Sequence, residues 1–143
     1  MHKQAVFGAL ELVSIPSLGV KDVLAKVDTG AYTGALHCEK IKVVKNSNGD
    51  KVLQFQPISR KHTKVTVADY QLVTVKSSSG HTEKRYAIPV TLEIQGTTYS
   101  SYIGLTTRSG LKRQILIGRR FLREHDILVD VTKDLNDDKL ESF

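Results

Sequence analysis

The chain has 143 residues, 40% of them hydrophobic, which is enough for one globular core, and we expect a single domain over residues 1–143. No apolar run is long enough to cross a bilayer and no apolar signal segment opens the sequence, so we expect a soluble, cytoplasmic protein without a membrane partner. The net charge is +6, but tryptophan is absent and aromatic residues make up only 6%, which argues against a base-stacking surface for nucleic acid.

The predicted elements are mainly strands. Alternating or aliphatic stretches predict strands, and short segments rich in Gly, Ser, Asn or Pro separate them. In chain order, the predicted strands cover residues 6–15, 23–27, 41–44, 52–55, 65–75, 85–94, 99–105, 115–117 and 127–131. A helical pattern over residues 119–125 lies between the last two. Many short strands with one short C-terminal helix favour an all-β fold, a closed or nearly closed β-barrel.

The first candidate site follows the predicted strand over residues 23–27, where the sequence continues Asp28-Thr29-Gly30-Ala31. An apolar strand that ends in a carboxylate, a small hydroxyl and a glycine delivers an acid to a tight turn, where backbone amides can hold it. Aspartic peptidases present their catalytic acid in this way. The same residue types are common in ordinary β-turns, so the interpretation depends on a second element.

The second element is the aliphatic run that ends in Ile117, followed by Gly118 and Arg119. The run predicts a short buried strand that the glycine ends. In retropepsins, the single-lobed aspartic peptidases, an apolar-apolar-Gly-Arg segment packs beside the catalytic turn. The two motifs occur here in the same order, and the chain resembles that family.

More narrowly, four patches resemble the bacterial retropepsin-like group often labelled ATP-dependent zinc proteases, namely residues 25–31, 35–37, 76–80 and 105–109. The resemblance implies a retropepsin-like acid-protease barrel and aspartic endopeptidase activity. It also implies a functional link to ATP-grasp ligases that join amino acids to peptides or proteins. The site residues it implies are Asp28, Thr29 and Gly30 for catalysis and Ile117, Gly118 and Arg119 for structural support.

A single Asp-Thr-Gly supplies only half of the required carboxyl groups. Peptide hydrolysis by acid-base catalysis needs two carboxyl groups close enough to share a proton. We therefore expect a homodimer in which Asp28 of both subunits meets on the symmetry axis. Thr29 would donate its hydroxyl across this axis, and Gly30 would let its amide approach the carboxylates. Ala31 would keep the floor of the substrate cleft small.

A hairpin over residues 73–85, with Ser77-Ser78-Ser79-Gly80 near its tip, is the candidate cover of the cleft. Small residues at a tip allow opening and close approach to an extended peptide substrate. We expect Ser78, Ser79 and Gly80 to contact that substrate. The alternative is an ordinary solvent-exposed turn.

Zinc fits the sequence poorly despite the group's label. There is no His-Glu-x-x-His motif, and the five histidines define no zinc-site spacing. His37 and Cys38 are neighbours, so on a strand they would point to opposite faces and not share a metal. Cys38 fits a buried thiol better than a nucleophile. No phosphate-binding loop for ATP occurs, and we expect no metal and no cofactor.

Two further features leave alternatives open. The segment over residues 37–63 exceeds what a minimal peptidase needs, so it would either close the cleft or extend the sheet. A non-catalytic module of the same fold could instead bind peptides or an anionic partner through a basic run, although a solvated basic surface is the simpler interpretation. Within that run, Arg119 is expected to pair with a carboxylate near the Asp28 turn. The run consists of Arg108, Lys112, Arg113, Arg119, Arg120 and Arg123.

Overall fold

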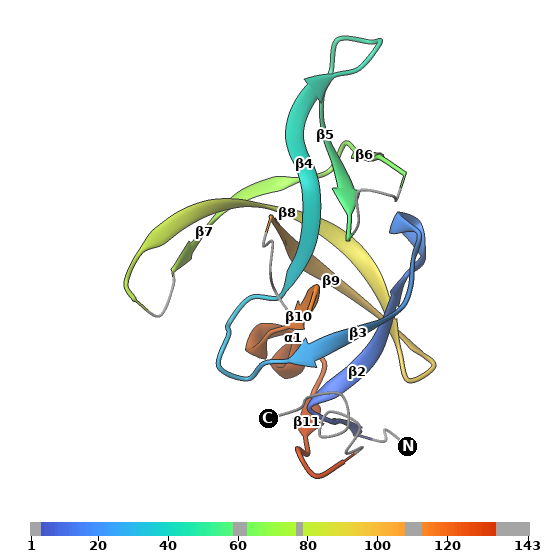
Figure 1. The fold of residues 1–143 in the computed structure, drawn as a ribbon, viewed down its shortest axis with the longest axis vertical. Helices are drawn as coiled ribbons and strands as arrows, with labels where there is room; N and C mark the ends of the chain where they lie inside the picture. Colours follow the sequence, from blue (N-terminus) through green and yellow to red (C-terminus); the bar gives the residue numbers. More distant parts are fainter. Residues whose placement is uncertain (1–3, 59–62, 77–78, 108–112, 134–143) are drawn as a thin grey trace.

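The computed structural model describes residues 4–58, 63–76, 79–107 and 113–133, and these form mainly β-strands (Figure 1). In chain order the elements are β1 (Ala5–Phe7), β2 (Leu10–Ile15), a 3-10 turn (Pro16–Leu18), β3 (Val20–Val27), β4 (Ala35–Lys45), β5 (Lys51–Pro57), β6 (Val65–Val67), β7 (Gln71–Lys76), β8 (Thr82–Ile94), β9 (Thr97–Thr106), β10 (Ile115–Ile117), α1 (Arg119–Glu124) and β11 (Ile127–Val129).

The main sheet has nine strands and closes on itself. The order is β10-β3-β2-β8-β9-β4-β5-β6, β7 pairs with β8, and β10 also pairs with β4, so β10 joins the two sides of a ring. A separate two-stranded parallel sheet joins β1 to β11 near both ends of the chain (Figure 1). The prediction of a nearly closed β-barrel with one short helix is therefore confirmed.

Buried and exposed side chains alternate along the strands, and the buried ones fill the interior of the ring. In β8, Ile88, Val90, Leu92 and Ile94 are buried, whereas the residues between them are exposed. This is the two-residue period of a strand with one face on a core. Each fully buried aliphatic side chain contributes about 1.5–3 kcal/mol relative to exposure. The largest fully buried side chains include Phe7, Ile15, Leu36, Leu53, Phe55, Leu105 and Ile115.

Two predicted strands are each divided in the structure. The stretch over residues 6–15 splits because the chain leaves the β1–β11 sheet for the main sheet at Gly8, where a Cβ would lie 2.8 Å from the carbonyl oxygen of Lys133. The stretch over residues 65–75 splits because β6 pairs with β5 while β7 pairs with β8. Sequence periodicity alone cannot show that one apolar stretch serves two different partners.

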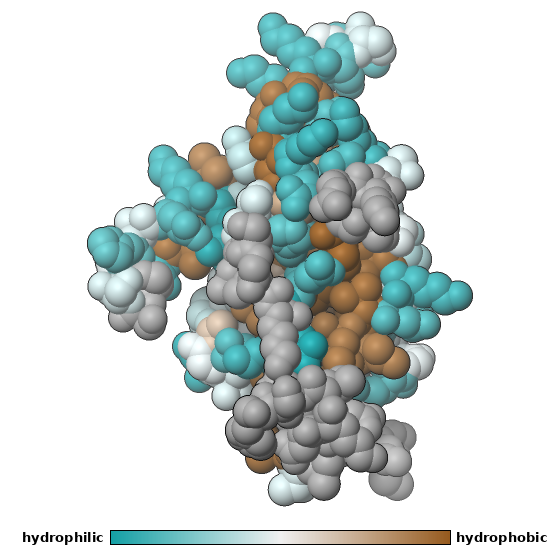
Figure 2. Space-filling model, in the orientation of Figure 1, coloured by the Kyte–Doolittle hydropathy of each residue, from teal (hydrophilic) through white to brown (hydrophobic). Residues whose placement is uncertain are grey.

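The described part of the segment over residues 37–63 extends the sheet. β4 and β5 form a long hairpin that projects from the ring, and β6 adds to its edge (Figure 1). The side-chain oxygen of Asn46 orders the tip, because it accepts from the amides of Asn48 and Asp50 at 2.9 and 3.0 Å. The tip is hydrophilic, while an apolar area lies lower on the same face (Figure 2). Within the described residues, no helix is long and apolar enough to span a membrane.

Candidate active site

The Asp28 turn lies directly beside β10, as the two motifs predict. β3 and β10 run parallel with Val27 opposite Ile117, and the amide of Asp28 donates to the carbonyl oxygen of Ile117 at 2.9 Å. Because that bond continues the ladder by one residue, it fixes the position at which β3 ends and the turn begins. Asp28 is half-buried at this point.

Backbone amides hold the turn. The amide of Gly30 donates to Oδ1 of Asp28 at 3.0 Å, and the amide of Ala31 donates to the carbonyl oxygen of Asp28 at 3.2 Å. The first bond orients the carboxylate, because a charged acceptor forms a short and directional bond with a backbone amide. Thr29 and Gly30 are both exposed, so this side of the turn is open to a second molecule.

Two glycines allow the turn to pack against the end of β10. A Cβ on Gly118 would lie 2.7 Å from the carbonyl oxygen of Tyr32 and 2.9 Å from the amide nitrogen of Gly34. A Cβ on Gly34 would lie 2.8 Å from the carbonyl oxygen of Leu116. These distances leave no room for a side chain at either position. The glycine of the Ile-Gly-Arg element is therefore required by close packing on the turn.

Arg119 supports the turn, but through a different partner from the one predicted. Its Nη1 donates to the carbonyl oxygen of Thr29 at 2.8 Å, and its amide donates to that of Ala31 at 2.7 Å. Its guanidinium carbon also lies 5.6 Å from the ring centre of Tyr32. The expected carboxylate partner was wrong, because the acceptor of the Arg119 guanidinium among the described residues is the backbone carbonyl of Thr29.

The hairpin expected over residues 73–85 is present. β7 and β8 pair antiparallel with Val73 opposite Arg85 and Lys76 opposite Thr82. Ser79 and Gly80 are exposed near its tip, and Gly80 has a φ of +88°. Ser78 lies outside the described residues. Contact of the tip with a substrate stays a prediction.

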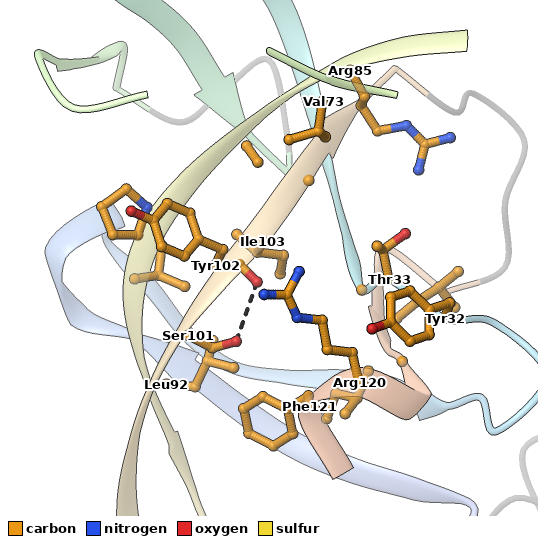
Figure 3. Close-up of a pocket in the computed structure, with 18 of the residues that line it drawn as sticks. Tyr32, Thr33, Val73, Arg85, Leu92, Ser101, Tyr102, Ile103, Arg120 and Phe121 are labelled. Atoms are coloured by element: carbon orange, nitrogen blue, oxygen red, sulfur yellow. Dashed lines mark hydrogen bonds between the residues drawn. The ribbon is translucent and has the colours of Figure 1, made fainter. Parts of the chain in front are cut away.

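A pocket of about 770 Å³ lies under the base of this hairpin (Figure 3). Asp28 does not line this pocket, which begins at Tyr32, just beyond the turn. Sequence reasoning missed the pocket because several segments that lie far apart in the sequence converge to form it. Its walls include Tyr32 and Thr33 after the turn, Val73 and Arg85 in the hairpin, Ser101, Tyr102 and Ile103 in β9, and Arg120 and Phe121 in α1.

Comparison with known proteins gives the family. Residues 6–139 match the family described as "Retropepsin-like aspartic endopeptidase RimB". The chain belongs to this RimB-like family. The resemblance to retropepsins is therefore confirmed. Catalytic roles for Asp28, Thr29 and Gly30, and substrate contact for Ala31, stay predictions.

Two relatives of this RimB-like chain are each named "Probable alpha-L-glutamate ligase". That of Shewanella pealeana is 30% identical over 130 residues, which cover 87% of this chain but 28% of the relative. That of Parasynechococcus marenigrum is 27% identical over 152 residues, which cover 100% of this chain and 32% of the relative. The chain thus spans roughly a third of the length of these relatives, which join a RimB-like region to a ligase.

A solved structure agrees on the fold. The crystal structure of a Legionella pneumophila protein of unknown function superimposes with a TM-score of 0.71 and 21% sequence identity. The match covers 91% of this RimB-like chain and 95% of the other chain. At this identity the likeness shows the fold alone.

The residues that the structure describes fit a metal poorly. Among them, no group of three His, Cys, Asp or Glu side chains is placed to hold a metal ion. Cys38 is fully buried, and burial raises the pKa of its thiol to about 12, so the thiol is protonated and a poor nucleophile at neutral pH. Nε2 of His37 lies 3.3 Å from Oε1 of Glu39.

Three arginines of the basic run of this RimB-like chain have different surroundings in the structure. Arg119 bonds the Asp28 turn, and Arg120 lines the pocket. Arg123 is exposed on the same helix. Arg108 and Lys112 lie outside the described residues. Arg119, Arg120 and Arg123 therefore have different neighbours, which their spacing in the sequence did not reveal.

Proposed function

We propose that this RimB-like chain is an aspartic endopeptidase that acts as a homodimer, with Asp28 of each subunit forming the catalytic pair. The observation that carries the proposal is the support of the Asp28 carboxylate, which accepts from the amide of Gly30 at 3.0 Å on a turn fixed to β10. The family description, a retropepsin-like aspartic endopeptidase, supports the same activity.

The reaction needs one proton shared between the two carboxyl groups. The ionised Asp28 takes a proton from a water molecule, whose oxygen attacks the carbonyl carbon of the scissile peptide bond. The protonated Asp28 of the other subunit donates to the carbonyl oxygen, which gives a neutral tetrahedral intermediate. Collapse of the intermediate breaks the C–N bond, and the leaving amine takes a proton from the pair. The pH dependence belongs to the pair and not to one residue.

The turn supports assembly of such a pair. One chain contributes one Asp-Thr-Gly, so a second copy has to supply the other carboxyl group. Thr29 and Gly30 are exposed at the end of the turn, where a second subunit can approach. Arg119 holds the carbonyl oxygen of Thr29 at 2.8 Å, which keeps the outer part of the turn in place before a partner arrives.

The relatives suggest the substrate class. Their names describe probable ligases of glutamate, and each contains a region like this chain within a longer protein. A peptidase region joined to such a ligase is suited to removing or trimming what the ligase adds. We therefore propose peptides or proteins that carry peptide-bonded glutamate as substrates, with an ATP-grasp glutamate ligase as the functional partner.

A non-catalytic peptide-binding module is the second candidate. The observation in its favour is that the described pocket, with a volume of about 770 Å³, is lined by residues beyond the turn and not by Asp28. Such a module would bind glutamyl peptides without cleaving them.

The test is hydrolysis of glutamyl peptides, followed by mass spectrometry, with the intact protein and two variants. Asp28→Asn should abolish cleavage and preserve the circular dichroism spectrum, because it removes the ionisable group but keeps the side-chain shape. Asp50→Asn makes the same change at the exposed tip of the β4–β5 hairpin and should cleave normally. A chelator should do little, whereas loss of activity that zinc restores would favour a metallopeptidase. Binding without any cleavage would favour the second candidate.

A further inference from the structure

Arg120 occupies the pocket under the β7–β8 hairpin. Its side chain extends from α1 into the space between Ser101 and Tyr102 on one side and Tyr32 and Thr33 on the other (Figure 3). The guanidinium is directed away from the helix and toward the hairpin (Figure 3). The end of this side chain is thus presented to any molecule that enters the pocket.

One bond orients the guanidinium and leaves its outer edge available. Nε of Arg120 donates to Oε1 of Glu124 one helical turn away, at 2.8 Å. The two terminal amino groups carry the remaining N–H donors, and no side chain or carbonyl in the described ranges accepts from them. An exposed i,i+4 ion pair is weak, and this one uses only Nε of Arg120. The terminal amino groups can therefore still bind a second carboxylate.

Two guanidinium groups and one carboxylate of the described residues line the pocket. Arg85 also lines it, with a side chain that is 16% exposed and paired with Glu83. Among the described lining residues, Glu124 is the one carboxylate against these two guanidinium groups. The inner wall is apolar, with Phe121 and Ile103 among its members, and a less polar environment strengthens an ion pair compared with bulk water.

Backbone bonds fix this pocket relative to the Asp28 turn. The amide of Arg120 donates to the carbonyl oxygen of Tyr32 at 2.9 Å, next to the bond at 2.7 Å from the amide of Arg119 to Ala31. The segment that supports the proposed catalytic turn therefore also sets where the guanidinium stands. If a peptide binds at the turn and in the pocket, Arg120 would contact a side chain at a fixed distance from the scissile bond.

We propose that Arg120 is the specificity-determining residue of this chain, and that it selects an acidic side chain of the bound peptide by a bidentate bond from its terminal amino groups. The planar guanidinium matches the two oxygens of a carboxylate, which a lysine ammonium does not. The role of Arg120 in selecting a peptidase substrate rests on the proposed function. Binding of an acidic peptide by Arg120 does not require that the chain cleaves it.

The test measures binding to the Asp28→Asn protein, which removes cleavage as a variable. Fluorescently labelled tetraglutamate and tetraglutamine peptides are titrated and followed by anisotropy. The protein should prefer tetraglutamate, and a further Arg120→Gln change should weaken tetraglutamate binding by roughly 10- to 100-fold and remove the preference. Arg120→Glu should reverse the preference toward tetralysine.

Arg123→Gln is the matched control, since it removes the same charge from the same helix at an exposed residue that does not line the pocket. It should change tetraglutamate binding little. Equal weakening by Arg120→Gln and Arg123→Gln would overturn the proposal, because binding would then depend on overall charge. Equal affinity for tetraglutamate and tetraglutamine would overturn it as well. If Arg120-dependent selection is found but intact protein never cleaves, the peptidase proposal fails and the pocket assignment stands. If glutamyl peptides are cleaved equally well with and without Arg120→Gln, the pocket assignment fails and the peptidase proposal stands.

Discussion

Gly118→Ala tests whether close packing of β10 on the turn builds the site. The backbone of Gly118 has a φ of −91° and a ψ of 173°, which alanine adopts without strain. The added Cβ, however, would lie 2.7 Å from two backbone atoms, the carbonyl carbon of Thr33 and the carbonyl oxygen of Tyr32. Both belong to the segment that follows Asp28, so this segment has to move.

Overpacking of this kind costs about 1–3 kcal/mol, and the upper half of that range applies because main-chain atoms cannot rotate away. For a chain of this size, about 2–3 kcal/mol lowers the Tm by roughly 6–15 °C. Thermal unfolding followed by circular dichroism gives the shift. Cleavage of a glutamyl peptide should fall as well, because the Asp28 turn moves with its neighbours.

Gly49→Ala is the control. Gly49 has a φ of +85° with open space around its Cβ position, so alanine there meets strain but no clash. The expected loss is about 1 kcal/mol with normal activity, since Gly49 lies at the tip of the β4–β5 hairpin. A Gly118→Ala protein as stable and as active as the unmodified chain would refute the packing argument.

Two further predictions concern Arg119 and Cys38. Arg119→Lys keeps the charge but loses the planar donor to the carbonyl oxygen of Thr29. The free energy of unfolding, measured in urea, should fall by about 1 kcal/mol, and activity should fall as well. Full activity would mean that the charge alone is sufficient. The Cys38 thiol, with its pKa raised by burial from 9.0 to about 12, should resist iodoacetamide at pH 8 until the protein unfolds, and rapid labelling of the native protein would contradict its burial. The thiol ionises at lower pH in the unfolded chain than in the folded protein, so its contribution to the free energy of unfolding should decrease as the pH rises from about 9 toward 12. Cys38→Ala should remove this part of the pH dependence.

The sequence predicted the parts of the site that lie in short, continuous motifs. Asp28 follows an apolar strand and Gly118 ends another. The resemblance to retropepsins that these two motifs carry implied that Asp28 lies beside Ile117, as it does in the structure. The hairpin with Val73 opposite Arg85 followed from two strand patterns around a Gly- and Ser-rich turn.

The sequence could not predict contacts that depend on distant segments. β10 closes the ring by pairing with both β3 and β4, which periodicity within a single segment does not encode. The pocket around Arg120 needs β7, β8, β9, α1 and the end of the Asp28 turn to converge. Arg120 and Glu124 form an i,i+4 ion pair within the predicted helix, but the helical pattern does not give the direction of Arg120 toward a pocket.

Subunit mixing tests the central claim, a catalytic pair of Asp28 residues from two chains, most directly. The intact protein is allowed to exchange subunits with increasing amounts of Asp28→Asn protein, and cleavage is measured per intact subunit. With random exchange, a ninefold excess of the variant should leave roughly one tenth of the original activity per intact subunit, because most intact subunits then sit in dimers that lack one carboxyl group. Constant activity per intact subunit at every ratio would show that each chain works alone and would contradict the shared pair.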